Sequence, residues 1–332
     1  MILLSGGSGK RLWPLSNDVR SKQFLKIFPR EDGSSISMVQ RVYRQIRRAV
    51  PSARVTIATS QGQVSVLREQ LGDGVDICVE PCRRDTFPAI ALASAYLHDV
   101  KGVGRNETVA ICPVDPYVEE PYFRSVKRLA ELAEQGMARL MLMGIEPSYP
   151  SEKYGYILPS DSGEVSYVTS FKEKPDEETA AGYIAAGALW NSGVFSCSLG
   201  YLLDQALDLV GMCTYQELEN RYESLERISF DYAVVEKEKD ICVLRYPGEW
   251  KDLGTWNTLT EVMKENVGDV TMDDGCSNTH VINELGIPLL CMGLKDMVVV
   301  AGPDGILVSD KQSSGRLKEY AVAISETRKK GT

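Results

Sequence analysis

Histidine is scarce in this chain, and its cysteines are not paired in sequence. The 332 residues include two histidines and eight cysteines, and no two cysteines form a C-x-x-C pair. A structural zinc site and catalysis by histidine are therefore not expected. Scattered cysteines of this kind are typical of reduced thiols, and they predict a cytoplasmic protein.

Long hydrophobic runs are also lacking. A membrane-spanning helix needs about 20 apolar residues, and no stretch of the sequence approaches that length. The apolar run at the N-terminus is too short for a secretion signal and leads straight into a polar loop. We therefore expect no contact with a membrane.

The chain has too little basic charge for a broad nucleic-acid surface. Its net charge is −9, yet residues 1–54 contain 11 Lys and Arg against 3 Asp and Glu. A basic segment in an otherwise acidic protein favours a local anionic ligand, and no nucleic-acid partner is expected.

A glycine-rich loop directly follows the first apolar run. Residues 2–4 lead into Ser5-Gly6-Gly7-Ser8-Gly9, with Arg11 close behind and Lys22 a short loop later. Glycines allow backbone N–H groups to approach an anion, and two fixed cations suit a polyphosphate. The loop is therefore a candidate phosphate site.

Two other phosphate-binding motifs are excluded by spacing. A P-loop requires glycine where Leu4 stands and a hydroxyl residue where Arg11 stands. A dinucleotide fingerprint requires a third glycine where Leu12 stands.

Residues 1–150 alternate predicted strands and helices, which indicates βαβ units. We expect a Rossmann-like, doubly wound, mostly parallel α/β sheet, whose ligands bind beyond the carboxyl ends of the strands. The glycine loop, residues 80–85 and Asp115 each follow a strand, so they are expected to converge. The predicted strands are 54–60, 75–79, 109–114 and 140–145, and the helices are 37–50, 62–71, 86–98 and 121–135.

Shorter elements follow residue 150. We predict one large domain over residues 1–265, with halves 1–150 and 151–265, and a small β-rich C-terminal region over 266–332. The β-rich region offers a surface for a homodimer. The predicted strands are 153–157, 168–174, 189–195, 230–237, 241–246 and 248–254, and the helices are 176–186, one from 255 and one near 314–325.

The glycine loop resembles a known signature. Gly6-Gly7-Ser8-Gly9-Lys10-Arg11-Leu12, with Lys22-Gln23-Phe24-Leu25, is similar to the signature of the sugar-1-phosphate nucleotidyltransferases, in particular those that use mannose 1-phosphate. The competing interpretation, a glycine-rich turn with surface cations, does not explain so long a string. The resemblance implies a GT-A-like fold, a nucleotide held by Gly6, Gly7, Ser8 and Gly9, and catalytic cations at Arg11 and Lys22.

Two aspartates match the metal-binding positions of this family. Asp115 ends a predicted strand, and Asp252 lies in Asp252-Leu253-Gly254-Thr255-Trp256. The resemblance implies that both hold Mg²⁺, a cofactor that takes one or two carboxylates beside phosphates and waters. Taken singly, Asp115 could start a turn, and Asp252 could cap the helix at Thr255.

The sugar-phosphate site is implied by further motifs in residues 151–265. Phe171-Lys172-Glu173-Lys174-Pro175 matches the family's F-x-E-K-P, whose lysine holds the sugar phosphate. Gly155 and Asn191 lie in segments similar to those that contact the sugar, although Asn191 could equally be a buried residue satisfied by backbone. The resemblance thus assigns Gly155, Glu173, Lys174 and Asn191 to the sugar phosphate, and residues 1–150 to the nucleotide.

The stretch Glu80-Pro81-Cys82-Arg83-Arg84-Asp85 lies where the family binds the base. Glu80, Arg84 and Asp85 are the candidates. Asp85 replaces the usual asparagine, and it could either accept from guanine or cap the following helix.

The sequence therefore predicts an enzyme that binds two small molecules, an NTP and a sugar 1-phosphate. GTP and mannose 1-phosphate would give GDP-mannose and pyrophosphate. The alternatives are the same chemistry with another base or sugar, and a non-catalytic regulatory protein that binds nucleotide sugars.

Overall fold

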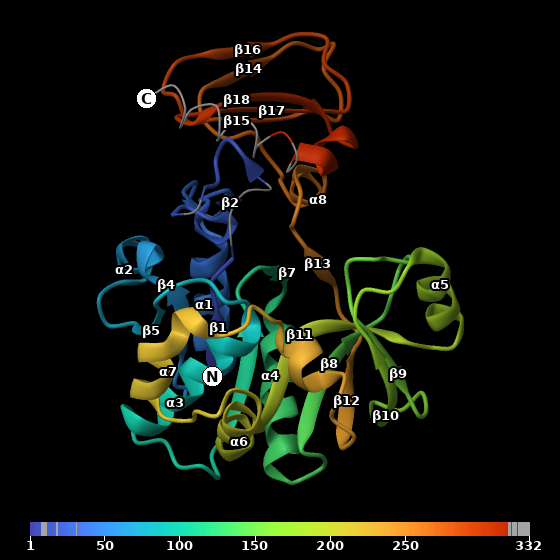
Figure 1. The fold of residues 1–332 in the computed structure, drawn as a ribbon. Helices are drawn as coiled ribbons and strands as arrows, with labels where there is room; N and C mark the ends of the chain where they lie inside the picture. The colour runs from blue at the N-terminus through green and yellow to red at the C-terminus, as the bar shows by residue number, and fades with distance from the viewer. Residues whose placement is uncertain (8–11, 18, 31, 318–319, 321–323, 325–332) are drawn as a thin grey trace.

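A nine-stranded sheet forms the centre of the molecule (Figure 1). The structure is a computed structural model that describes residues 1–7, 12–17, 19–30, 32–317, 320 and 324. From edge to edge the strands are β5 (Asp76–Glu80), β4 (Thr56–Ser60), β1 (Ile2–Leu4), β6 (Thr108–Pro113), β11 (Leu189–Ser198), β8 (Leu140–Ile145), β12 (Ile241–Tyr246), β10 (Val165–Lys172) and β9 (Tyr156–Pro159).

The sheet is mixed, with a parallel half that carries the glycine loop. Strands β5, β4, β1 and β6 are mutually parallel, and so are β8 and β12. Strand β11 runs antiparallel between β6 and β8, and β10 runs antiparallel to β12 and β9. The expected α/β architecture is confirmed, but the prediction of a mostly parallel sheet is wrong, because β9, β10 and β11 make antiparallel pairs. The carboxyl ends of the parallel half meet at one edge.

Helices cover both faces of the sheet. Ile2 packs in one hydrophobic cluster and its neighbour Leu3 in the other, because successive residues of a strand point to opposite faces. One face is covered by α3 (Thr86–Asp99), α6 (Leu199–Val210) and α7 (Tyr215–Arg221), and the other by α1 (Met38–Ala49) and α4 (Glu120–Glu134). Burial on both sides explains why central strands such as β8 are continuous apolar runs.

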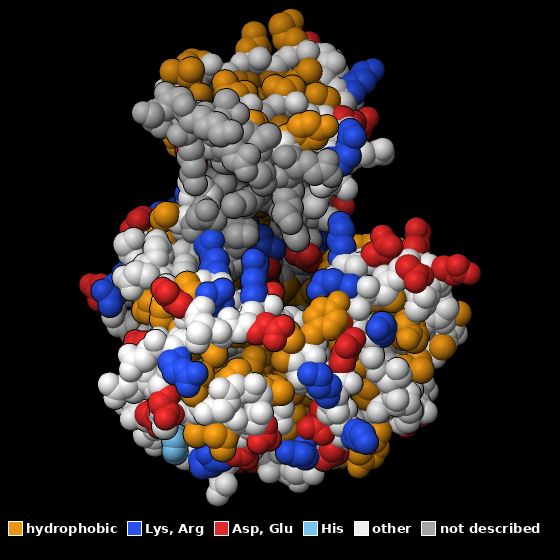
Figure 2. Space-filling view, viewed as in Figure 1, with side chains coloured by type: hydrophobic (Ala, Val, Ile, Leu, Met, Phe, Trp, Pro, Cys, Tyr) orange, Lys and Arg blue, Asp and Glu red, His pale blue; other side chains and the backbone are white. Residues whose placement is uncertain are grey.

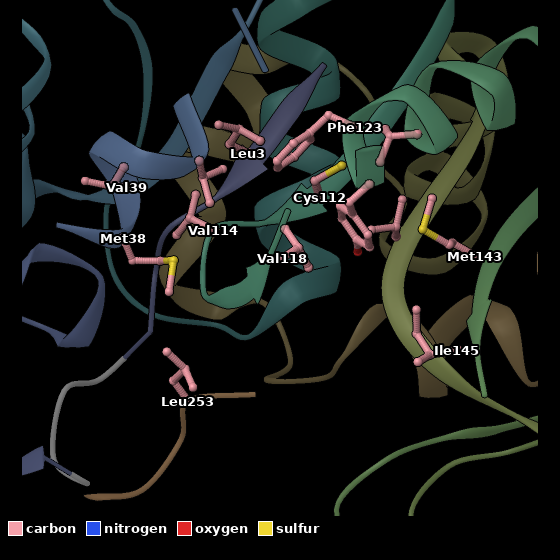
Figure 3. Packing of buried hydrophobic residues seen from close by; sticks show 14 of the residues in the cluster. Leu3, Met38, Val39, Cys112, Val114, Val118, Phe123, Met143, Ile145 and Leu253 are labelled. Atoms are coloured by element: carbon pink, nitrogen blue, oxygen red, sulfur yellow. The ribbon is translucent and has the colours of Figure 1, made fainter. Parts of the chain in front are cut away.

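The core on the α1 and α4 side extends toward the carboxyl edge of the sheet. Figure 3 shows Leu3, Val39 and Phe123 around the strand–helix contact, with Leu253 at the lower end of the same cluster. Leu253 follows Asp252 directly, so the packing of this core helps to place that carboxylate.

Helix starts agree with the capping residues in the sequence. Ser37 forms a capping box with Gln40 at the start of α1. Asp176 accepts from the backbone N–H of Thr179 at the start of α5 (Glu177–Ala185). These helices are predicted correctly because their caps are local features. The remaining helix of the N-terminal half is α2 (Val64–Leu71).

The prediction of a strand at 230–237 is wrong. Residues Asp231–Val235 form a π-helix, and the buried side chains of Phe230, Ala233 and Val234 follow a helical spacing. They pack in the cluster on the α3 and α6 side of the sheet. Helices α6 and α7 are further elements that the sequence analysis did not predict.

A small β-rich lobe follows the main body (Figure 1). Helix α8 (Trp256–Thr260) leads into it. The predicted final helix starts as a 3₁₀ turn at Ser313–Arg316, and most of its remaining residues lie outside the described part of the chain. The strands of the lobe are β14 (Val270–Met272), β15 (His280–Asn283), β16 (Leu289–Cys291), β17 (Met297–Gly302) and β18 (Gly305–Asp310).

None of the helices formed by the described residues has both the length and the apolar character that crossing a membrane requires.

Candidate active site

A cavity of about 280 Å³ opens at the carboxyl edge of the parallel strands. It is lined by the loop after β1 (Ser5, Gly6 and Gly7), the end of β5 (Glu80) and the end of β6 (Pro113 to Asp115). The three loops therefore converge as the topology predicts. Ser8, Gly9 and Arg11, which the sequence analysis assigned to the same site, lie outside the described residues.

Lys22 joins two aspartates from distant parts of the chain. Its Nζ lies 2.8 Å from an Oδ2 of Asp115 and 3.2 Å from an Oδ1 of Asp252. Burial alone would lower the pKa of Lys22, but the two facing carboxylates raise it above its ordinary value. The site thus holds one cation between two carboxylates.

Strand pairing brings the two aspartates together. Strand β13 (Trp250–Asp252) pairs antiparallel with β7 (Pro116–Val118), and the register sets Asp252 opposite Pro116, the residue after Asp115. The alternative role for Asp252, a cap at the start of α8, is wrong, because Thr255 itself caps that helix. Asp252 is therefore available to a ligand at the site.

The donor set fits a magnesium ion bound together with phosphates. Carboxylate oxygens are the protein ligands that Mg²⁺ takes, one or two at a time, and the facing carboxylates already share a cation. In the part of the chain that the structure describes, no group of three or more His, Cys, Asp or Glu side chains gathers as a metal site. Asp115 and Asp252 would thus supply the protein's share of the ligands, and phosphate and water oxygens the rest.

Glu80 is a buried carboxyl group in the wall of the cavity. Its side chain is 3% exposed, and the hydroxyl of Tyr222 donates to its Oε2 over 2.8 Å. Burial raises the pKa of Glu80 to about 7, although the Tyr222 hydrogen bond lowers it. A Cβ on Gly6 would lie 2.9 Å from Oε1 of Glu80, so the glycine leaves room for this carboxyl group.

The two neighbouring candidates, Arg84 and Asp85, have other contacts. Asp85 caps α3 by accepting from the backbone N–H of Thr86 over 2.8 Å, which confirms the capping interpretation, and it also borders the cavity. The guanidinium of Arg84 donates to the backbone carbonyl of Glu223. The arginines among the described residues that line the cavity are Arg83 and Arg227, which the sequence analysis did not select.

A second polar cluster contains the residues that the sequence analysis assigned to the sugar phosphate. The ammonium of Lys174 contacts the buried carboxylate of Glu173. A Cβ on Gly155 would lie 2.5 Å from Oε2 of Glu173 and 3.4 Å from Cβ of Asn191, so all four residues are close together. Lys174 has a φ of 47°, and Pro175 follows it.

Asp231 is an additional member of this cluster. Asn191 Nδ2 donates to Oδ1 of Asp231 over 2.6 Å, and Asn191 Oδ1 accepts from the backbone N–H of Gly193. Burial, and then the charge of Glu173, raise the pKa of Asp231 to about 7. The sequence analysis missed Asp231 because it placed residues 230–237 in a strand. The helical spacing of the apolar residues around it is the signal that could have found it.

Four aromatic rings connect the two clusters. The ring centroid of Tyr154 lies 4.9 Å from that of Trp190 and 5.4 Å from that of Trp250. The ring centroids of Tyr149 and Trp190 lie 5.1 Å apart. Three of these aromatic residues come just before a candidate site residue in the chain. Tyr154 precedes Gly155, Trp190 precedes Asn191, and Trp250 lies two positions before Asp252. Their packing therefore fixes strand β13, which carries Asp252, relative to the second polar cluster.

Figure 2 shows several Lys and Arg side chains along the rim of the main body that faces the β-rich lobe, with a few Asp and Glu side chains among them. Such a concentration attracts an anionic ligand.

Comparisons with known proteins show which sequences and structures this chain is similar to. Residues 1–267 match the family model described as "Nucleotidyl transferase". The chain is 33% identical to a mannose-1-phosphate guanylyltransferase of Escherichia coli, across 96% of this chain and 74% of that protein. It is 32% identical to the alginate biosynthesis protein AlgA of Pseudomonas aeruginosa, across 93% of this chain and 69% of that protein.

Solved structures give the same result for the fold. A crystal structure described as mannose-1-phosphate geranyltransferase from Thermus thermophilus superimposes with a TM-score of 0.83 at 28% identity, and each chain covers 98% of the other. A UDP-glucose pyrophosphorylase complexed with UDP-glucose superimposes with a TM-score of 0.55 at 16% identity, which shows a shared fold over 79% of this chain.

Proposed function

Because the chain belongs to the nucleotidyl transferase family, we propose that it transfers a nucleotidyl group from GTP to mannose 1-phosphate, giving GDP-mannose and pyrophosphate. The observation that carries this proposal is Lys22 between Asp115 and Asp252, beside a cavity walled by a glycine loop. The names of its relatives support the choice of base and sugar.

The nucleotide binds in the cavity. Backbone N–H groups of Gly6 and Gly7, with Ser8, Gly9 and Arg11 outside the described residues, hold the phosphates. Glu80, in its ionised form, accepts from the N–H groups of the base, and Tyr222 orients its carboxyl group. Asp85 serves mainly as a helix cap, and Arg84 supports the α7 side of the cavity through Glu223.

The sugar phosphate binds at the second cluster. Lys174 holds its phosphate, and the polar groups of Glu173, Asn191 and Asp231 face the sugar hydroxyls. Gly155 leaves room for the carboxyl group of Glu173, because a Cβ at this position would lie 2.5 Å from Oε2 of Glu173, and its backbone is the part that approaches the sugar.

The reaction is an in-line attack of the sugar phosphate oxygen on the α-phosphorus of the nucleotide. The P–O bond to the β-phosphate breaks, and pyrophosphate leaves. Mg²⁺ held by Asp115 and Asp252 would neutralise charge on the phosphates. Lys22 steadies the α-phosphate and Arg11 the leaving pyrophosphate, so catalysis consists of positioning and charge stabilisation.

Several features of the whole chain belong to the same proposal. The catalytic domain, a Rossmann-like GT-A-type fold, spans residues 1–265, with its nucleotide half in 1–150 and its sugar-phosphate half in 151–265. The lobe, 266–332, forms a homodimer contact, supported by exposed apolar side chains such as Ile287, Leu290 and Ile306, each more than 60% exposed. The protein acts in the cytoplasm, where its eight free thiols stay reduced.

Pyrophosphate release tests the function. The four common NTPs and dTTP are crossed with mannose, glucose and related sugar 1-phosphates in the presence of Mg²⁺. Release confined to GTP with mannose 1-phosphate supports both substrates. Release with another pair would support the same reaction but change the assigned base or sugar. Binding without release for every pair would indicate a regulatory protein. Light scattering of the purified protein tests the dimer.

A further inference from the structure

The described residues between the glycine loop and Lys22, 12–17 and 19–20, form a segment that the β-rich lobe holds. Arg20 donates two hydrogen bonds to Glu284, with Nη1 2.6 Å from Oε2 and Nη2 2.7 Å from Oε1. Asn17 Nδ2 donates to Oδ2 of Asp304 over 3.0 Å. A two-pronged contact between guanidinium and carboxylate fixes orientation as well as distance. Glu284 lies 264 positions after Arg20, and Asp304 lies 287 positions after Asn17.

Apolar packing adds to these polar contacts. A Cβ on Gly305 would lie 2.6 Å from Cζ2 of Trp13, and a Cβ on Gly302 would lie 2.8 Å from Cδ2 of Leu15. The segment therefore packs against one glycine of β17 and one of β18, which leave room for the side chains of Leu15 and Trp13. Leu15 is 1% exposed and belongs to the same hydrophobic cluster as Val300 of the lobe.

The start of α8 completes the contact. The indole Nε1 of the fully buried Trp256 donates to the backbone carbonyl of Trp13 over 3.1 Å. Trp256 lies four residues after Asp252. One end of the segment is thereby tied to the strand that carries a carboxylate of the site.

Lys22 comes one residue after this anchored segment. It lies two positions after Arg20, and two residues of chain span at most about 7 Å. Ser21 between them is buried, and Gln23 donates to the backbone carbonyl of Ser5 over 2.9 Å. The location of Arg20 consequently limits where the ammonium of Lys22 can be placed relative to Asp115 and Asp252.

We propose that the β-rich lobe is a positioning part of the active site: Glu284, Gly302, Asp304 and Gly305 hold residues 12–17 and 19–20 so that Lys22 stands between Asp115 and Asp252. The inference rests on the proposed function, since it concerns the lysine of that reaction. Glu284 and Asp304 are positioning residues that act through Lys22 and touch no reacting atom.

Glu284→Ala is the first variant, with Asp274→Ala, at an exposed aspartate of the same lobe, as its matched control. We expect Glu284→Ala to lower kcat for pyrophosphate release by on the order of tenfold to a hundredfold, the effect of a small misplacement of a reacting group. KM for the sugar phosphate should change little, because Lys174 lies in the other cluster. The melting temperature should stay near that of the wild type, since both side chains of the ion pair are partly exposed. Arg20→Lys keeps the charge but loses the two-pronged contact, and it should fall between the wild type and Glu284→Ala.

A double-mutant cycle separates positioning from a general structural role. If the lobe acts through Lys22, Glu284→Ala should cause no further loss of kcat in a Lys22→Met background. Equal losses in both backgrounds, or wild-type kcat in Glu284→Ala, would overturn the inference. A wild-type protein that releases no pyrophosphate with any substrate pair would instead refute the proposed function.

Discussion

Glu80 is a side chain whose charge changes near neutral pH. Burial raises its pKa from 4.5 to about 7, so much of the carboxyl group is neutral in the free protein at pH 6. A carboxyl group that accepts from the N–H groups of a base has to be ionised. Affinity for GTP should therefore increase about tenfold from pH 6 to pH 8. Isothermal titration across this range measures it, and a flat profile would argue against Glu80 as a base-binding residue.

Glu80→Gln provides the complementary stability measurement. Because the pKa is higher in the folded than in the unfolded chain, the contribution of Glu80 to stability is fully present below pH 4.5 and is lost as the pH rises through about 7. We expect Glu80→Gln to raise the denaturation midpoint at pH 8 and to leave it nearly unchanged at pH 4. A stabilisation of equal size at both pH values would show that the ionisation of Glu80 is not its cause.

Lys22 competes for the carboxylates that would hold the metal. Its ammonium lies within 3.2 Å of both Asp115 and Asp252. Removing this cation in Lys22→Met should strengthen binding of Mn²⁺, a spectroscopic substitute for Mg²⁺, about tenfold in the absence of nucleotide. Electron paramagnetic resonance of free Mn²⁺ measures the affinity. Lys26→Met, whose lysine pairs with the exposed Glu69, is the control and should match the wild type. Equal affinities in all three proteins would contradict the metal assignment.

At the scale of elements, helix α3 depends on its first residue. Asp85 caps the helix by accepting from the backbone N–H of Thr86, a hydrogen bond that an asparagine side chain can also accept and alanine cannot. Asp85→Ala should lower the free energy of unfolding by about 1 kcal/mol, and Asp85→Asn should stay within about 0.5 kcal/mol of the wild type. Denaturant titration measures both. Neither variant should change the preference for GTP over ATP, and a changed preference would make Asp85 a base-binding residue.

The helices and loops that were predicted correctly depend on residues that are close to them in the sequence. Ser37, Asp85 and Asp176 cap helices that begin where expected, and the loops after β1, β5 and β6 meet because parallel strands end at one edge. Composition and motif order were enough for the α/β fold and for candidate residues at both clusters.

The parts that sequence reasoning missed depend on distant contacts. Tyr222 reaches Glu80 across 142 residues, and Asp231 reaches Asn191 from a π-helix that resembles an apolar strand in sequence. The Arg20–Glu284 contact is likewise a product of folding, because neither residue belongs to a motif. Short-range patterns do not contain this information.

At the scale of the whole molecule, the lobe and the main body share one core. Ile282 and Val300 of the lobe belong to the same hydrophobic cluster as Leu3 and Met143 of the central sheet. We expect a single unfolding transition by calorimetry. Ile282→Ala, at a fully buried side chain, should destabilise the whole transition by about 2–5 kcal/mol. Val100→Ala, at an exposed side chain of the main body, should leave it unchanged. A separate, earlier transition for the lobe would show that the two parts unfold independently.

The positions of the tryptophans make the protein its own optical probe. All four lie beside the two polar clusters: the indole N–H of Trp256, four residues after Asp252, donates to the backbone carbonyl of Trp13, and the rings of Trp190 and Trp250 pack together next to the proposed sugar-phosphate cluster. Intrinsic fluorescence therefore originates near the two ligands rather than from the bulk of the fold. Replacing both tryptophans of one pair by phenylalanine would leave only the emission of the remaining pair. The Trp13 and Trp256 pair would then report on the nucleotide and the Trp190 and Trp250 pair on the sugar phosphate, so each ligand could be titrated without a label.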